Sequence, residues 1–324
     1  MNLQSSTTLT ATPERPWLRN ASYDTLDTNA GARTMAYTHT PIPFANSAQS
    51  VRKFGKNNST RPRHAVLKYI EELWQPYLHL LSLGTTVEEM KKREDGKWII
   101  TLRRIVQNED VLQPAKYMWW QEEFDAIVVA SGHFTVPKIP KIPGLKEVSA
   151  RFPDKFEHSK TWRSADNYVA KVQWNILSTT NSDMDVLTTL QKVIVVGGGV
   201  SAADLAEDLH DIVQDSLILS QRNELEFLRN AWNLPGTLQK PEITSFFTDY
   251  KDRVFAKFAD DTVSEFDRVI FATGYRLSYP FLPFQAVTPE NRLAGFYQHI
   301  FRISDPSLTV IGQVGGDVNW VSWH

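Results

Sequence analysis

KVIVVGGGVSAADLAEDL, residues 192–209, is the stretch of sequence that decides the fold. It begins with the continuous apolar run Lys192–Val196, which predicts a buried strand. We expect an amphipathic helix over Val200–Val213, because apolar residues recur there on one side. Leu217–Ser220 is the next expected strand. Strand, helix and strand within about thirty residues predict one β-α-β unit of a parallel sheet.

Glycines between the first strand and the helix predict a dinucleotide-binding turn. Residues 197–202 have the form G-x-G-x-x-A. Gly197 permits the tight turn, Gly199 lets the backbone approach a pyrophosphate, and Ala202 allows close packing of helix on strand. The N–H groups at the start of the helix then face the phosphates. Ser201 and Asp204 are further candidate cofactor-binding residues on the same helix.

The end of the second strand indicates which dinucleotide is bound. An NAD site usually has Asp or Glu there, which holds the ribose 2′-OH. This chain has Ser220-Gln221-Arg222 instead. A hydroxyl and a cation suit a 2′-phosphate, which a carboxylate would repel, so NADPH is favoured over NADH. Glu224 is a weaker candidate that would favour NAD, and a solvated surface arginine is the alternative interpretation of Arg222.

The rest of the chain adds the elements of a mixed α/β fold. The first sixty residues are rich in Thr, Asn, Ser and Pro and predict a loop. A helix is expected over Pro62–Tyr77, followed by a small antiparallel meander of extended segments, Leu78–Leu83, Thr86–Met90 and Lys97–Leu102. The apolar run Phe124–Ala130 predicts a buried parallel strand before a proline-rich connector. Further strands are expected at Val254–Phe258, Arg268–Ala272 and Leu308–Gly312.

Composition excludes several classes of protein. The 324 residues carry a net charge of −2, which gives no argument for binding nucleic acid. The absence of cysteine excludes disulfides, thiolate nucleophiles and Cys-ligated metals, and the eight histidines have no metal-ligand spacing. No apolar run is long enough to span a membrane, and the polar start has no signal-peptide pattern. We therefore expect a cytoplasmic protein without a metal site, whose oligomeric state the sequence leaves open.

Several segments, in the same order as in a known family, resemble the flavin-containing monooxygenases among the class B flavoprotein monooxygenases. They are YDTLDTN at residues 23–29, followed by Met35-Ala36-Tyr37; FDAIVVASGHFTVPKIPKIPGL at 124–145; HSKTWR at 158–163; the glycine turn itself; and DRVIFATGY at 267–275. The resemblance implies an α/β fold of the two-dinucleotide-binding-domain flavoprotein type. In that fold a Rossmann NADPH domain, about residues 155–270, is inserted into an FAD-binding domain. Residues 1–145, with the β-meander, and 271–324 would be the two parts of the FAD domain, which is incomplete.

The resemblance also implies a reaction. NADPH would reduce FAD, O₂ would add to give a C4a-hydroperoxyflavin, and a nucleophilic N or S of a small molecule would be oxygenated. Asn29 would be the active-site asparagine, and the other cofactor contacts would include Thr28, Thr273 and Gly274. A neutral amide can orient a hydroperoxide without protonating it. The alternative interpretation is that Asn29 merely caps a turn.

The chain departs from the family in four places. Nothing before Tyr23 resembles the family's first strand and FAD fingerprint, which suggests N-terminal truncation relative to the family. Residues 172–191 match nothing in it and suggest an untrimmed intron or a surface insertion. Trp162 stands where Baeyer–Villiger monooxygenases carry tryptophan, although core packing would also explain it. The family's closing helix is not found after LTVIG.

These departures leave two alternatives open. One is oxygenation of a ketone, and the other is a non-catalytic protein that binds NADP. An NADPH dehydrogenase without flavin is disfavoured, because the chain has no catalytic Tyr-x-x-x-Lys pair and no suitably placed His–Asp pair.

Overall fold

The computed structural model describes residues 21–23, 25–37, 39–106, 116–168, 191–213, 215–222 and 225–312. The chain divides into two compact units. One, here the Rossmann unit, combines Ala21–Leu73 with Lys138–Gly274. The other, here the meander unit, combines Trp74–Pro137 with the chain from Tyr275 onward. Residues 172–190, most of the suspected insertion, lie outside the described residues.

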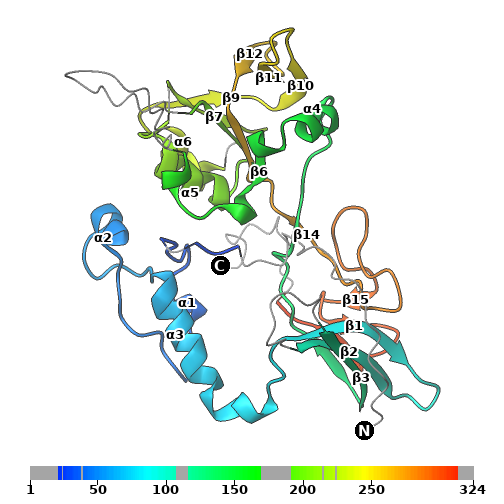
Figure 1. Ribbon diagram of the computed structural model, residues 1–324. Coiled ribbons are helices and arrows are strands. Elements are labelled where there is room, and N and C mark those ends of the chain that lie inside the picture. Colours follow the sequence, from blue (N-terminus) through cyan, green and yellow to red (C-terminus); the bar gives the residue numbers. More distant parts are fainter. Residues whose placement is uncertain are drawn as a thin grey trace, which may run out of the picture. The chain divides into compact units, whose positions relative to one another are not determined.

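The Rossmann unit is built on a five-stranded parallel sheet (Figure 1). Its strand order is β6-β13-β7-β8-β9, and every neighbouring pair is parallel. The strands are β6 (Phe156–His158), β13 (Arg268–Phe271), β7 (Val193–Val196), β8 (Leu217–Ser220) and β9 (Thr237–Lys240). Helix α5 (Val200–Leu209) connects β7 to β8. The predicted β-α-β unit and the α/β fold class are confirmed.

The core of this unit lies between the sheet and α5. All four residues of β7 are buried, and Ala202, Ala206 and Leu209 on α5 are 0% exposed. The helix ends at Leu209 rather than at the predicted Val213, because the chain turns at His210–Ile212. Trp162 and Trp232 complete the same apolar cluster. The short helices η6 (Glu226–Leu228) and α6 (Arg229–Trp232) lie between β8 and β9.

A second, antiparallel sheet belongs to the same unit. It has the order β10-β11-β12, with β10 (Ile243–Thr248), β11 (Val254–Phe258) and β12 (Val263–Glu265). Helix α4 (Leu145–Arg151) contributes to its apolar cluster. The strand predicted at Val254–Phe258 is confirmed, and it belongs to this smaller sheet. The short 3₁₀ helices η3 (Pro153–Lys155), η4 (Ser159–Thr161) and η5 (Ala165–Asn167) follow α4.

Segment Ala21–Leu73 contains more helix than its composition predicts. Helices α1 (Ala32–Met35) and α2 (Ala48–Phe54) fall in the stretch expected to be a loop, so that expectation is wrong there. The Ser47 hydroxyl caps α2 by accepting the N–H of Ser50, and Gly55 ends the helix with φ of 80°. Two caps stabilise a helix too short to show an apolar period.

Helix α3 (Arg63–Trp74) confirms the helix predicted at Pro62–Tyr77. Tyr69 on this helix is buried with Ala32 and Ile42, and these three residues form the whole buried part of a small apolar cluster. The chain continues directly into the 3₁₀ helix η2 (Gln75–Leu80).

The meander unit begins with three antiparallel strands (Figure 1). They are β1 (Thr85–Lys92), β2 (Trp98–Val106) and β3 (Lys116–Phe124). Strands β1 and β2 confirm two of the three extended segments predicted for the meander. The segment expected at Leu78–Leu83 is wrong, and the third strand, β3, was not predicted. The first residues of that segment belong to the 3₁₀ helix η2 instead. This helix has a proline in its first turn, a position where proline suits a helix and disfavours a strand.

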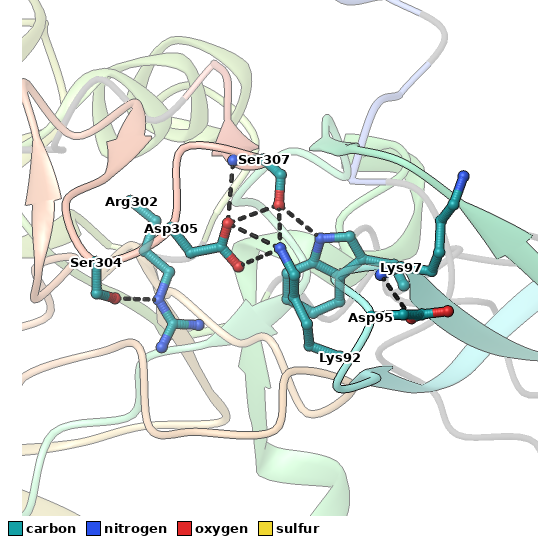
Figure 2. A network of polar contacts seen from close by, with 8 residues as sticks. Lys92, Asp95, Lys97, Arg302, Ser304, Asp305 and Ser307 are labelled. Atoms are coloured by element: carbon teal, nitrogen blue, oxygen red, sulfur yellow. Dashed lines mark hydrogen bonds and ion pairs between the residues drawn. The ribbon is translucent and has the colours of Figure 1, made fainter.

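Polar contacts connect the meander to the C-terminal strands of the same unit. Lys92 at the end of β1 donates to both carboxylate oxygens of Asp305, at 2.9 and 2.7 Å, and to the Ser307 hydroxyl at 2.6 Å (Figure 2). The indole N–H of Trp98 donates to the same hydroxyl at 2.9 Å. The turn predicted at residues 94–96 is present between β1 and β2.

Those C-terminal strands form a four-stranded sheet of order β15-β16-β17-β4. Its members are β15 (Phe296–Tyr297), β16 (Phe301–Arg302), β17 (Leu308–Val310) and β4 (Ile127–Val129). The parallel pairing of β4 with β17 confirms two predicted strands. The predicted burial of β4 is wrong in one respect, because Val128 is 62% exposed. Among the described residues, that face of β4 is not fully covered.

Two short strands accompany the connections between the units. They are β5 (Val136–Pro137) and β14 (Tyr275–Arg276), which pair antiparallel. Directly beyond them, the Lys138 N–H donates to the Gly274 carbonyl at 2.9 Å. The outgoing and returning chains are therefore held together where they cross. No helix among the described ranges is long and apolar enough to cross a membrane.

Candidate functional site

The turn after β7 is shaped by two glycines with different constraints. Gly197 has φ of 141°, and a Cβ built on it would lie 2.3 Å from the Ala272 carbonyl oxygen. No side chain fits there, because a heavy atom at that distance overlaps the backbone of the next strand. A Cβ added to Gly199 would have no heavy atom of the described residues within 4 Å, so packing among these residues leaves space beside Gly199. The open side of Gly199 is where a ligand can approach the backbone.

The start of α5 has the properties of an anion site. Gly199 is the N-cap, no side chain caps the helix, and no acidic residue lies in the first turn. The first N–H groups of a helix lack partners within it and carry its positive dipole end. Ser201 is exposed at this end, whereas Ala202 is 0% exposed and packs on the sheet. The tight turn at Gly197 and the close packing of Ala202 on the sheet are as predicted, and the contacts of Gly199 and Ser201 with a cofactor stay predictions.

At the end of β8, the two residues proposed to bind a 2′-phosphate differ in burial. Ser220 is 1% exposed and its hydroxyl donates to the Pro241 carbonyl at 2.9 Å, so that proton is engaged inside the protein. Arg222 has a side chain 77% exposed, with its Nε 3.9 Å from the Glu242 carboxylate. The guanidinium is therefore accessible and weakly paired. Glu224 lies outside the described residues.

Thr28 and Asn29 lie in a bend held by the backbone before α3. The N–H of Thr28 donates to the Arg61 carbonyl at 2.9 Å, and the Arg61 N–H donates back to the Thr28 hydroxyl at 3.0 Å. The same hydroxyl donates to the Ala30 carbonyl at 2.9 Å. Asn29 is exposed, and its amide makes no hydrogen bond with the described residues. Thr28 thus has a structural role in the bend, and the Asn29 amide does not cap it.

Asp204 lies on α5, away from the glycine turn. Its carboxylate accepts the Tyr23 hydroxyl at 2.9 Å. Burial raises the pKa of Asp204, and the bond from Tyr23 lowers it by less. Burial, with the adjacent Asp204 charge, also raises the pKa of Tyr23. The polar end of Asp204 is therefore occupied by another part of the chain.

Thr273 and Gly274 follow β13 at the return crossing. The Thr273 hydroxyl donates to the Lys138 carbonyl. The Gly274 carbonyl lies 3.0 Å from Nε2 of His158, whose Nδ1 accepts the Lys160 N–H at 3.1 Å. This arrangement fits a neutral imidazole with its proton on Nε2. Burial lowers the pKa of His158 from 6.5 to about 4, and the Gly274 bond raises it by less.

Trp162 is a core residue of the Rossmann unit. It is 2% exposed and its ring centroid lies 5.1 Å from that of Tyr168. Packing therefore accounts for a tryptophan at this position, and it does not distinguish a ketone substrate from an amine or thioether.

Two polar contacts escaped the sequence analysis. The bond between His158 and Gly274 joins two segments that were identified separately by resemblance. The Tyr23–Asp204 bond joins residues 181 positions apart. Spacing along the chain carries no signal for either contact, because both depend on tertiary packing. In the described part of the chain, no group of three or more His, Cys, Asp or Glu residues could hold a metal ion.

Comparison with known proteins identifies the family. Residues 40–233, more than half of the 324-residue chain, match the family described as pyridine nucleotide-disulphide oxidoreductase. The senecionine N-oxygenase of Tyria jacobaeae is 29% identical over 245 residues, 72% of this chain and 43% of that protein. The trimethylamine monooxygenase of Methylocella silvestris is 30% identical over 196 residues, 60% of this chain and 36% of that protein.

A solved structure has the same fold. The S-allyl-L-cysteine S-oxygenase of Allium sativum aligns with a TM-score of 0.66 at 20% identity, covering 95% of this chain and 62% of that one. The chain spans about half the length of the relatives that it matches. It belongs to the pyridine nucleotide-disulphide oxidoreductase family, and its resemblance to the flavin-containing monooxygenases is confirmed.

Proposed function

We propose that the protein is an FAD- and NADPH-dependent monooxygenase that oxygenates a nucleophilic nitrogen or sulfur of a small molecule. One atom of O₂ enters the substrate and the other leaves as water, with the two electrons supplied by NADPH. The proposal is carried by the glycine turn between β7 and α5, with Gly197 closed against the sheet and Gly199 open. The N- and S-oxygenating relatives support the choice of substrate atom.

The residues of this turn fit the nicotinamide cofactor. In the proposal, the pyrophosphate lies over Gly199 and the N-terminus of α5, and Ser201 contributes its exposed hydroxyl. Arg222 is the cation proposed for the 2′-phosphate, because its guanidinium is accessible and held only weakly by Glu242. Ser220 would contribute through the position of its backbone rather than its hydroxyl, which is engaged by Pro241.

The described residues offer a smaller part of a flavin site. Thr273 and Gly274 at the crossing, with Thr28 and Asn29 in the bend, are proposed to contact it. Among the described residues, the turn at Gly197 is the only glycine-rich helix start of the dinucleotide type. The groups that would hold the FAD diphosphate are therefore not among them. When bound, the flavin supplies the chemistry that activates O₂.

Asn29 is proposed to orient the reacting oxygen. Its amide is exposed and is not engaged by the described residues, so it can donate to and accept from a ligand. A neutral amide has no proton to release at physiological pH. It would therefore orient the reacting oxygen by hydrogen bonding without giving up a proton to it.

The visible absorption spectrum tests this proposal. The purified chain is measured alone and again after FAD is added and the excess removed. Flavin bands that are bleached by NADPH without O₂, followed by oxygenation of trimethylamine or a thioether, are expected. A matched Asn29→Ala variant should keep the bands and release more H₂O₂ per NADPH. A colourless chain that still binds NADPH would instead establish the non-catalytic alternative.

A further inference from the structure

One face of α5 carries three carboxylates, each contacted by the same distant segment. Asp204, Glu207 and Asp208 are spaced three and four positions apart, so they lie on one side of the helix. Their partners are the Tyr23 hydroxyl at 2.9 Å from Asp204, the Lys53 ammonium paired with Glu207, and the Gln49 side chain, which favours the charged form of Asp208 and lowers its pKa. All three partners belong to Ala21–Leu73.

The segment has little apolar surface with which to hold its place. The buried part of its own cluster is limited to Ala32, Ile42 and Tyr69. Tyr23 is its described residue that packs against the apolar cluster around α5. The contacts with the carboxylates are therefore a large share of what attaches the segment to this helix.

Retaining these carboxylates has an energetic cost. Burial raises the pKa of both Asp204 and Asp208, which means that the site disfavours their charge. Apolar side chains of similar size would pack there without that cost. An aspartate can accept a directional hydrogen bond from Tyr23, and an apolar residue cannot. Because the bond is directional, it fixes the position of Tyr23 relative to α5.

The Tyr23 bond is relayed to the bend at Thr28 and Asn29. Arg63 donates from Nε to the Ser22 hydroxyl at 3.1 Å and from its N–H to the Leu26 carbonyl at 2.8 Å. Thr28 and Arg61 exchange backbone and hydroxyl bonds at 2.9 and 3.0 Å. Ser22, Leu26 and Thr28 are thus hydrogen-bonded to Arg61 and Arg63, next to and at the start of α3. Tyr23 connects this part of the chain to α5.

We infer that Tyr23 and Asp204 are positioning residues, whose hydrogen bond fixes the Thr28–Asn29 bend to the helix that carries the glycine turn. The inference rests on the proposed NADPH function, because it couples the place of the bend to nucleotide binding at the start of α5. Nucleotide that orders α5 is expected to order the bend as well, and the Tyr23–Asp204 bond is the contact with α5 that lies nearest to the bend along the chain.

The test is amide hydrogen exchange over residues 26–35 of the full chain, with and without NADP⁺. In Tyr23→Phe the exchange should become at least about tenfold faster, the factor that loss of about 1.4 kcal/mol gives. Protection of residues 26–35 by NADP⁺, expected in the wild type, should disappear. The dissociation constant for NADP⁺ should stay within about threefold, because the glycine turn is untouched.

Two variants separate positioning from packing. Tyr168→Phe is the matched control, because the Tyr168 hydroxyl is likewise buried and donates to a carboxylate, that of Glu157, outside this segment. It should leave exchange over residues 26–35 unchanged. Asp204→Asn keeps an oxygen for the Tyr23 hydroxyl and removes the buried charge, so it should retain the protection by NADP⁺.

The outcomes distinguish the inference from the proposed function. If the wild type binds no NADP⁺, the proposed function fails and the inference falls with it. If NADP⁺ binds but residues 26–35 gain no protection, only the inference is overturned. It is also overturned if Tyr23→Phe exchanges like the wild type, or if Tyr168→Phe has the same effect.

Discussion

Strands β7 and β4 are both short apolar strands with a parallel neighbour, yet they have different surroundings. Every residue of β7 is buried, and Val195 at its centre is 0% exposed. In β4, the central Val128 is 62% exposed while Val129 is 6% exposed. Parallel strands are buried when helices cover both faces of the sheet. An apolar run in the sequence therefore predicts a strand. Whether burial stabilises that strand depends on the helices or sheets that pack on its two faces.

The largest expected effect on stability is at the two glycines after β7, one of which faces a neighbouring strand while the other faces open space. In Gly197→Ala the new Cβ would overlap the Ala272 carbonyl, 2.3 Å away, at a φ of 141°. We expect a loss of about 3 kcal/mol or more in the free energy of unfolding, measured by urea denaturation. Gly199→Ala is the control, because its Cβ position is open. It should unfold like the wild type and bind NADP⁺ more weakly; equal destabilisation by both would contradict this account.

Truncating the central valine of each strand tests burial directly. Val195→Ala removes methyl groups from a 0% exposed side chain and should cost about 2 kcal/mol, including the cavity left behind. Val128→Ala should cost less than about 0.5 kcal/mol, because water already reaches the side chain. The two urea midpoints are compared. A cost at Val128 as large as that at Val195 would mean that β4 is covered in solution.

Two histidines extend the comparison to polar groups. Burial lowers the pKa of His158 to about 4, so the unfolded chain takes up a proton below about pH 6.5 that the folded chain does not. This contribution to stability is complete above that pH and is lost as pH falls towards 4. The wild-type free energy of unfolding should therefore drop across this window, on the order of 1 kcal/mol from this group.

His158→Gln should have a shallower decline over the same pH range, because the amide does not titrate. His133→Gln is its control, since Nδ1 of His133 also lies 3.1 Å from a glycine carbonyl, that of Gly312, but at a partly exposed site. Equal slopes for the wild type and His158→Gln would assign the acid sensitivity to other groups.

The pair between Arg222 and Glu242 should give the smallest effect. Both side chains are more than half exposed and 3.9 Å apart, so Glu242→Gln should change stability by less than about 0.5 kcal/mol. Freed from the carboxylate, Arg222 should bind 2′,5′-ADP about twofold to threefold more tightly, with AMP unchanged. Calorimetric titration measures both ligands. Equal tightening of AMP would show that Arg222 does not read the 2′-phosphate.

The sequence was most informative where local pattern and packing agree. The strand predicted at Lys192–Val196 and the helix predicted at Val200–Val213 are observed at Val193–Val196 and Val200–Leu209, because a strand and a helix around a glycine turn need those residue types in that order. The sequence was least informative at α2, which is stabilised by its caps and has no apolar periodicity from which a helix could be predicted. The exposure of Val128 could not be predicted either, because it depends on the layers that cover the strand.

For the candidate site, the sequence identified residue types but not their engagements. The pattern assigned different roles to Gly197 and Gly199, but only the structure shows that the first faces the Ala272 carbonyl and that no described heavy atom lies within 4 Å of a Cβ on the second. Ser220 was proposed for its hydroxyl, which the Pro241 carbonyl engages. Asp204 gained its partner, Tyr23, from tertiary packing alone. The motif predicts which positions lie at the candidate site. The hydrogen bonds of the folded chain determine which of their side chains are available to bind a ligand.

The crossing at Lys138 and Gly274 has a consequence for how such a chain can grow. The entropic cost of closing a loop depends on its length, yet here the ends of residues 138–274 are already bonded, 2.9 Å apart. For β5 and β14, which pair next to this bond, the long segment between them therefore has the same effect as a tight turn. We therefore expect a change of length inside residues 138–274 to leave the pairing of β5 with β14 unchanged.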